Sequence, residues 1–189
     1  KTVNKLLIQN QQTVTNVPKE ILDLNELENR LKSNAMIKTA EVYLAIDGKV
    51  QADVIQRKPI AWVNTNASYY IDDEGEYMPL SKNFTAHVPL VTGAIEKNNL
   101  INVFTIASKI VNDEFLKAHI VEIHQNQDQT IVLKTRVFDF EIELGDLKEL
   151  DKKINNLKAF YQKAKKDETL NKYRTVNLEF NNQVVCTKK

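Results

Sequence analysis

The residues that could carry out catalysis or hold a metal ion are few in this chain of 189 residues. Its three histidines are His87, His119 and His124, and none belongs to an HExxH pattern. His119 and His124 are five residues apart in an expected strand, so their side chains would point to opposite faces and could not chelate one ion. We therefore expect no metal site and no cofactor.

The remaining reactive groups also lack the partners that chemistry requires. The acidic run at residues 72–74 precedes Gly75 and a strand, which is ordinary turn composition, and the spacing of a calcium-binding EF-hand is missing. Cys186 is the only cysteine and has no neighbouring base in the sequence, so we expect a structural thiol. The four glycines form neither a phosphate-binding loop nor a nucleophile elbow. The sequence therefore predicts that the protein is not an enzyme.

Composition narrows the class of protein further. Hydrophobic residues make up 42% and charged residues 27%, which is typical of a folded globular chain. The formal net charge is +1, which argues against a nucleic-acid-binding protein with a basic face. No apolar run approaches the ~20 residues that a membrane-spanning helix needs.

The clearest structural pattern is an alternation of apolar and polar residues on both sides of Asp47-Gly48. Even-numbered positions are apolar in both arms, for example Val42 and Leu44 before the turn and Val50 after it. This period of two predicts a hairpin with one buried face. A two-residue turn would place the two apolar sets on opposite faces. We therefore expect a connection of three or five residues, with a bulge.

The elements around this hairpin predict two domains that join at Pro59. The first, residues 1–58, has a helix at residues 24–32, capped by Asp23 or Asn25. We also expect residues 1–10 to be helical, with a strand as the alternative. The second, residues 59–189, should hold short strands and two flanking helices. Pro59 should begin a strand because it cannot donate to a sheet ladder. The strands are expected at residues 60–63, 68–71, 76–80, 88–92, 119–125, 130–135, 137–144, 173–180 and 183–187.

Two details of this prediction concern helix starts, and a third concerns the core. Asn99 should cap a helix over residues 100–112. Asp146 and Glu149 form a D-x-x-E pattern typical of a capping box, which predicts that a second helix begins there. Trp62 follows the strand-starting proline and is expected in the core.

The last segment is the most informative candidate for a functional surface. Residues 173–187 read as two strands, with Val176, Leu178 and Phe180 on one face and Thr175 and Asn177 on the other. A strand at the end of a chain is often at the edge of a sheet, where unpaired N–H and C=O groups can accept a strand from another protein. The alternative is an ordinary edge strand protected by its own charges.

The order and spacing of several short stretches resemble the FtsQ/DivIB family of bacterial cell-division proteins, and most of all its Bacteroidetes branch. These stretches are LNELENRLKSN, IKTAEVYL, QRKPIAWV, YYIDDEGEYMPLS, VPLVTG and the terminal YRTVNLEFNNQVVCTKK. The resemblance implies an α+β fold, in which a truncated POTRA-like α/β module is followed by a mixed, mainly antiparallel β domain with two flanking helices. It also implies that the first strand of the POTRA module, a transmembrane helix and a short cytoplasmic tail precede Lys1.

The same resemblance implies a function and a set of contact residues. The protein would be a non-enzymatic divisome scaffold, the periplasmic part of a single-pass inner-membrane protein at the division septum. It would bind FtsB-like and FtsL-like proteins by strand addition at its C-terminal edge, while the POTRA module would contact other divisome members. The expected contact residues are Thr175, Asn177, Glu179, Phe180, Asn182, Gln183, Val184 and Cys186. This chain has Asn-Asn at residues 181–182, where the proteobacterial relatives commonly have a Ser-Gly type of turn.

Two other functions fit the sequence less well. A POTRA-bearing secretion or outer-membrane assembly factor would usually carry repeated POTRA modules or a barrel, whereas this chain has a single copy. A periplasmic hydrolase would need a nucleophile next to a base, and no such pair is visible.

Overall fold

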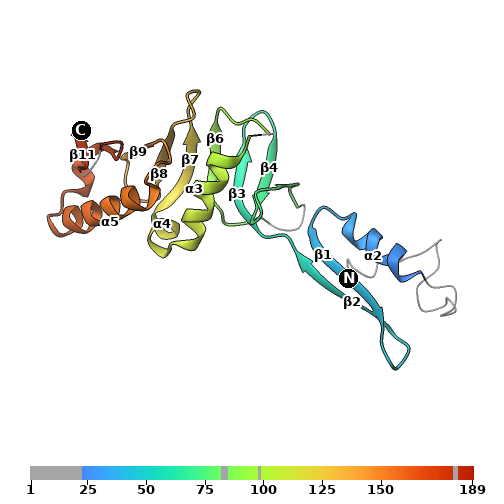
Figure 1. Ribbon diagram of the computed structural model, residues 1–189. Coiled ribbons are helices and arrows are strands. Elements are labelled where there is room, and N and C mark those ends of the chain that lie inside the picture. Colours follow the sequence, from blue (N-terminus) through green and yellow to red (C-terminus); the bar gives the residue numbers. More distant parts are fainter. Residues whose placement is uncertain (1–22, 82–84, 98, 181–182) are drawn as a thin grey trace. The chain divides into compact units, whose positions relative to one another are not determined.

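The computed structural model describes residues 23–81, 85–97, 99–180 and 183–189, and it confirms the α+β class (Figure 1). The chain divides into two compact units between Lys58 and Pro59, the position that the sequence suggests for the domain boundary. The helix expected at residues 1–10 lies outside the described residues. No helix in the described ranges is long and apolar enough to cross a bilayer.

The first unit packs one helix against one hairpin. Helix α2 (Leu24–Lys32) begins where Asp23 accepts a hydrogen bond from the backbone N–H of Glu26 at 3.0 Å, so the first of the two expected caps is the correct one. Leu27 and Leu31, one helical turn apart, are completely buried against the hairpin. Burial of the alternating apolar face therefore holds this unit together.

The hairpin confirms the register that the apolar pattern requires. Strands β1 (Ile37–Leu44) and β2 (Val50–Gln56) pair antiparallel with Val42 opposite Ala52 and Leu44 opposite Val50. Five residues connect the strands, and Gly48 adopts a left-handed conformation (φ 82°) within them. Even positions thus face even positions. The register shift of this hairpin lies between Ile37 and Thr39, at the end away from the connection where the bulge was expected.

The second unit is built on one open sheet of nine strands (Figure 1). Its spatial order is β11-β10-β9-β8-β7-β6-β3-β4-β5, which leaves β11 and β5 at the two edges. Three of the neighbouring pairs are parallel and five are antiparallel, which confirms a mixed, mainly antiparallel sheet. The strands are β3 (Pro59–Asn64), β4 (Ser68–Asp72), β5 (Tyr77–Met78), β6 (Leu90–Gly93), β7 (Ile120–Gln125), β8 (Ile131–Thr135), β9 (Glu141–Gly145), β10 (Tyr173–Asn177) and β11 (Val185–Lys188).

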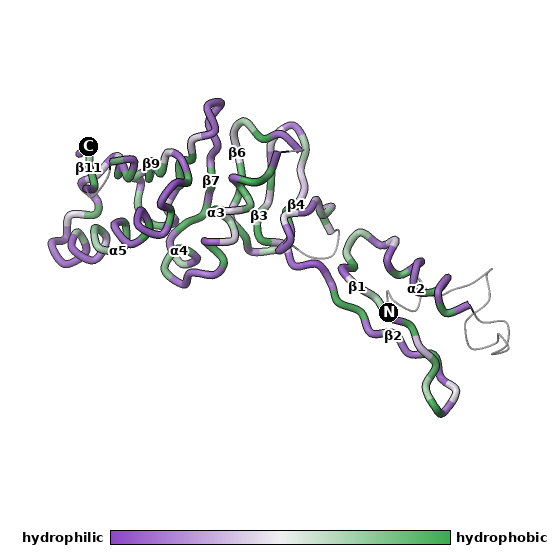
Figure 2. Tube along the Cα trace, viewed as in Figure 1, coloured by the Kyte–Doolittle hydropathy of each residue, from purple (hydrophilic) through white to green (hydrophobic). Residues whose placement is uncertain are grey.

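Helices α3 (Ile101–Asn112), α4 (Glu114–His119) and α5 (Leu150–Lys166) cover one face of this sheet (Figure 1). Their apolar sides and the strands share a single core, which includes Ile106, Leu116, Leu157 and Phe140. Figure 2 shows the complementary pattern, with hydrophilic residues along much of α5 and at the β7–β8 loop. The short helix η3 (Leu170–Lys172) leads from α5 into β10.

Several of the predicted helix boundaries were wrong. Helix α3 starts after Leu100, which makes no side-chain capping bond, so Asn99 is not its cap. Helix α5 starts at Leu150, because Glu149 adopts a left-handed conformation (φ 49°) that a capping box does not allow. Helix α4 was not expected, and His119 is its last residue rather than the start of a strand. Its capping residue is Asp113, whose carboxylate accepts from the N–H of Leu116 at 3.1 Å.

The expected strands are also shorter than the alternation of their residues suggested. Residues 137–140 precede β9 instead of belonging to it, β10 ends at Asn177, and β5 has only two residues. The alternation of apolar and polar residues continues beyond the residues that have a neighbouring strand to pair with. It therefore predicts strands that are too long.

Gly93, at the end of β6, is the glycine whose replacement should harm the fold most. Its φ is 96°, and a Cβ there would lie 2.1 Å from the backbone oxygen of Gln125 on β7. We predict that Gly93→Ala lowers the free energy of unfolding by at least about 3 kcal/mol, because the strained backbone and the clash add.

Gly75→Ala is the matched control for this prediction. Its φ is similar, at 84°, but a Cβ would meet only the ring of Phe104, at 3.2 Å. We expect it to cost about 1 kcal/mol. Urea unfolding monitored by circular dichroism measures both, and equal losses would contradict the role assigned to the close approach of β6 and β7.

Candidate functional site

The edge strand β11 presents a row of backbone groups with no neighbour on its outer side among the described residues. On its inner side it pairs antiparallel with β10, with Val185 opposite Asn177 and Cys186 opposite Val176. Strands at the margin of a sheet are the usual place where another chain can be added.

One hydrogen bond just beyond the end of β11 shows which of its peptide groups point toward β10 and which point outward. The N–H of Lys189 donates to the carbonyl of Lys172 at 2.9 Å, and the adjacent residues Tyr173 and Lys188 face each other. In an antiparallel ladder such a bond flanks a pair that does not hydrogen-bond. The register shifts on β10 between Tyr173 and Thr175, but β11 has no extra residue there, so its peptide groups still point to alternate sides from one residue to the next. Val185 and Thr187 therefore bond to β10, whereas the peptide groups of Cys186 and Lys188 point outward.

Side chains on β11 alternate between the two faces of the sheet. Cys186 and Val184 pack against the core on the side of α5, whereas Val185 is exposed on the other side. Burial raises the pKa of the Cys186 thiol above its ordinary value, so the thiol stays protonated at neutral pH. Cys186 is thus suited to packing rather than to nucleophilic chemistry.

A groove of about 450 Å³ runs beside the edge, between α5 and β11. Phe160 and Tyr173 form part of its wall, with ring centroids 5.3 Å apart in an edge-to-face arrangement. Val184 and Cys186 line the opposite side. The edge therefore offers both main-chain groups and an adjoining recess for a side chain.

The remaining predicted contact residues lie in three different settings. Thr175 and Asn177 belong to β10, whose backbone pairs with β9 on one side and β11 on the other, so only their side chains could touch a partner. Glu179 and Phe180 follow β10 and are exposed, and Gln183 is exposed before β11. Asn182 lies outside the described residues.

Asn177 explains why β10 ends where it does. Its amide nitrogen donates to Glu143 at 2.6 Å, and its amide oxygen accepts from the backbone N–H of Glu179 at 2.8 Å. This local bond turns the chain away from β9 after Leu178. Asn177 is therefore better explained as a structural residue of the turn than as a contact residue, a role that alternation alone could not reveal.

Helix α5 is tied to the end of β9 through contacts that sequence inspection missed. Lys153, which is 9% exposed, donates from Nζ to the carbonyls of Leu144 and Asp146 at 2.9 and 2.6 Å, and to a carboxylate oxygen of Asp146 at 3.0 Å. These bonds satisfy the carbonyl groups where β9 ends. The i, i+7 spacing from Asp146 to Lys153 was the available signal, since it bridges the turn before α5.

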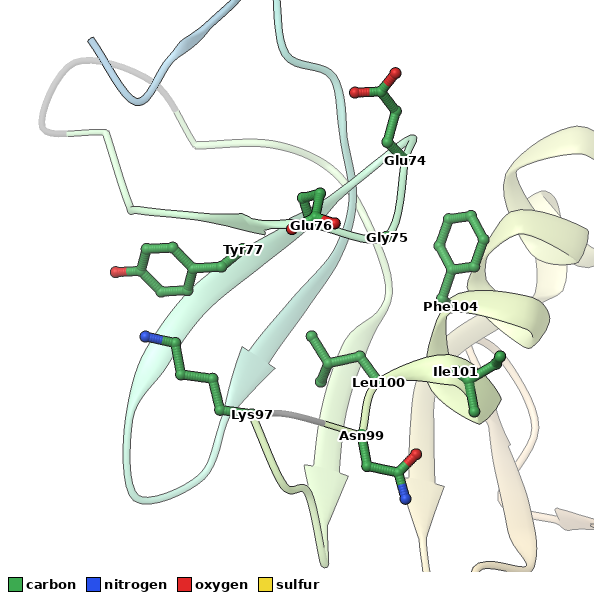
Figure 3. A pocket seen from close by; sticks show the side chains of 9 residues that line it. All are labelled: Glu74, Gly75, Glu76, Tyr77, Lys97, Asn99, Leu100, Ile101 and Phe104. Atoms are coloured by element: carbon green, nitrogen blue, oxygen red, sulfur yellow. The ribbon is translucent and has the colours of Figure 1, made fainter. Parts of the chain in front are cut away.

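The opposite edge, at β5, offers much less backbone. It spans two residues, and the ammonium group of Lys97 lies 4.2 Å from the centre of the Tyr77 ring. Figure 3 shows Lys97 alongside Tyr77, and Phe104 of α3 beside Gly75, around a cavity of about 740 Å³. Very short strands are one way in which proteins protect a sheet edge.

Comparison with known proteins places this architecture among cell-division proteins. A family model described as "FtsQ/DivIB, C-terminal related" matches residues 58–187. The chain is 20% identical to the cell division protein FtsQ of Geotalea daltonii over 179 residues, which cover 88% of this chain and 64% of that protein. It is 27% identical to the cell division protein DivIB of Clostridium tetani over 165 residues, 78% of this chain and 59% of that protein. The chain thus spans less than two thirds of the length of these curated relatives.

The ion pair that ties α5 to α4 yields a prediction about pH. Burial raises the pKa of Asp113, but hydrogen bonds from Lys158, at 2.5 Å, and from the N–H of Leu116 outweigh it, and the pKa lies below its ordinary value. A carboxyl group whose pKa is lower in the folded than in the unfolded protein stabilises the folded state at pH values above its unfolded pKa. This stabilisation is lost as the pH falls through the pKa of the folded state.

We predict that Asp113→Asn costs about 1–2 kcal/mol at pH 7 and that the difference from wild type disappears as the pH falls from 7 to below about 4, the ordinary pKa of an aspartate. The control is Asp151→Asn, which removes the exposed ion pair with Lys109 and should cost well under 1 kcal/mol. Urea unfolding across this pH range tests both variants. A cost of Asp113→Asn that does not change with pH would contradict the assignment.

Proposed function

The chain belongs to the FtsQ/DivIB family of cell-division proteins, and on this premise we propose that it is a non-enzymatic scaffold that binds a partner strand along β11. The observation that carries the proposal is the outward direction of the Cys186 and Lys188 peptide groups at a free sheet edge. Four main-chain groups, two donors and two acceptors, are therefore available at a spacing that matches an added strand.

The partners that we propose are FtsB-like and FtsL-like division proteins. Their strand would pair with Cys186 and Lys188, and one of its side chains would enter the groove between α5 and β11. Exposed Val185, on β11 itself, and exposed Phe180, in the segment before β11, would add apolar contact area. The whole protein would be anchored in the inner membrane with this unit in the periplasm, at the septum.

The unit of residues 1–58 has a separate role in this proposal. We infer that it is a POTRA-like module, because a helix and a hairpin with one shared apolar face are the parts of that module that follow its first strand and first helix. It would contact other members of the division complex. Family membership favours this function over a secretion or outer-membrane assembly factor.

Proline substitution on β11 tests the strand-addition proposal. Cys186→Pro removes an outward N–H but leaves the bonds to β10 intact, and edge strands tolerate proline at such positions. We predict that it weakens binding to the FtsB-like ectodomain from the same genome about tenfold or more, since a main-chain bond is lost and the ring blocks the approach. Isothermal titration calorimetry measures the affinity.

Two variants control for side effects of this change. Cys186→Ala also loses the thiol but keeps the N–H, and it should bind within about threefold of wild type. Thr187→Pro removes an N–H that bonds to β10 and should disrupt the β10–β11 pair itself, visible as a lower melting temperature. If Cys186→Pro stays folded and binds as well as Cys186→Ala, strand addition at this edge is wrong.

A further inference from the structure

A smaller cavity, of about 330 Å³, lies in the second unit away from β11, where strands β6 and β7 begin. Its apolar wall is supplied by β3, the segment before β6, the end of α3 and the start of β7. The residues are Trp62, Val88, Pro89, Leu90, Ile110, Val111, Ile120 and Val121. A mostly apolar recess of this size is at the small end of the range in which proteins bind ligands.

Trp62 forms a fixed part of this wall. Its indole N–H donates to the hydroxyl of Ser68 at 2.8 Å, and its backbone N–H donates to the carbonyl of Pro89 at 2.9 Å. The ring is half-buried rather than enclosed, so the expectation that Trp62 is a core residue is only partly met. Because its polar edge is already satisfied, the ring offers an apolar surface to whatever enters.

The rim of the cavity is cationic. Lys117 and Arg136 line it and are exposed, and none of the described residues that line it is acidic. Within the described part of the chain, neither cation forms a salt bridge. Arg136 is oriented by a bond from Nε to the carbonyl of Ala118 at 3.3 Å and by a backbone bond to the carbonyl of His119 at 2.7 Å. Two positive charges at the rim of an apolar recess, of which Arg136 is held in place, are complementary to an apolar group with a neighbouring anion.

We propose that this cavity binds a segment of another protein in which one apolar side chain is adjacent to carboxylate side chains. The apolar side chain would lie against Trp62 and Val111, and the carboxylates would meet Lys117 and Arg136. Two cations are too few for strong attraction to a membrane surface, which is built from about 1 kcal/mol per basic residue. This site is separate from the β11 edge and does not depend on the function proposed above.

The chain carries its own reporter for this site, because Trp62 is its only tryptophan. The probe is the peptide acetyl-Gly-Leu-Glu-Asp-Gly-amide, which has no aromatic residue. We expect its addition to the intact protein to shift the emission of Trp62 in a saturable way that weakens as salt is raised. The peptide with Gln-Asn in place of Glu-Asp, and the one with Gly in place of Leu, should each bind at least tenfold more weakly.

Charge-reversal variants test whether the two cations at the rim of the cavity bind the acidic peptide. The double variant Lys117→Glu, Arg136→Glu should lower the affinity for the acidic peptide at least tenfold, whereas Lys165→Glu, Lys166→Glu makes the same charge change on α5 and should leave it unchanged. Melting temperatures equal to that of wild type show that the variants are folded. If the variant Lys117→Glu, Arg136→Glu does not fold, Lys117→Arg, which keeps the charge, should still bind the acidic peptide.

Three results would overturn the proposal. They are an emission of Trp62 that the acidic peptide does not change, an equal response to the Gln-Asn peptide, and a saturable response to vesicles of anionic phospholipid that matches the response to the peptide. Cys186→Pro should bind the acidic peptide as wild type does, which separates this site from the β11 edge.

Discussion

An open sheet must end in two rows of peptide groups that no strand of the same sheet can satisfy, and this constraint organises the second unit. The nine-stranded sheet cannot close, so β5 and β11 each carry such a row. The two ends are built differently. The β5 end is reduced to two residues, beside a Tyr77 ring that Lys97 covers, whereas the β11 end keeps four residues and a groove beside them. The difference in available backbone is what makes β11 the better candidate for an added strand.

The β11 edge can serve this purpose only if it is held in a fixed position. Helix α5 lies along the last strands and inserts Ile154, Leu157 and Ala164 into the core. Lys153 satisfies carbonyl groups where β9 ends, and the ion pair between Lys158 and Asp113 connects α5 to the start of α4. A strand that joins β11 would thus meet a pre-arranged ladder, which reduces the conformational entropy that binding must overcome.

Sequence reasoning succeeded where a local pattern had one physical solution. Apolar residues occupy even-numbered positions on both sides of Asp47-Gly48, which allowed only a connection with an odd number of residues. The connection has five residues. It failed where one specific side-chain bond or backbone conformation, rather than the alternation of residue types, determines where an element begins or ends. Alternation in residues 137–144 and 173–180 suggested longer strands, but Asn177 turns the chain through a bond to Glu179 and ends the pairing with β9. The D-x-x-E pattern also did not reveal the left-handed conformation of Glu149, which delays the start of α5.

In the proposed mode of binding, the peptide groups of Cys186 and Lys188 stay exposed to water until a partner strand pairs with them. Amide hydrogen exchange, followed residue by residue by NMR with and without the FtsB-like ectodomain, tests it directly. We expect fast exchange at Cys186 and Lys188 in the free protein, slower exchange at Val185 and Thr187, and protection of all four in the complex. Unchanged fast exchange at Cys186 and Lys188 in a saturated complex would contradict it.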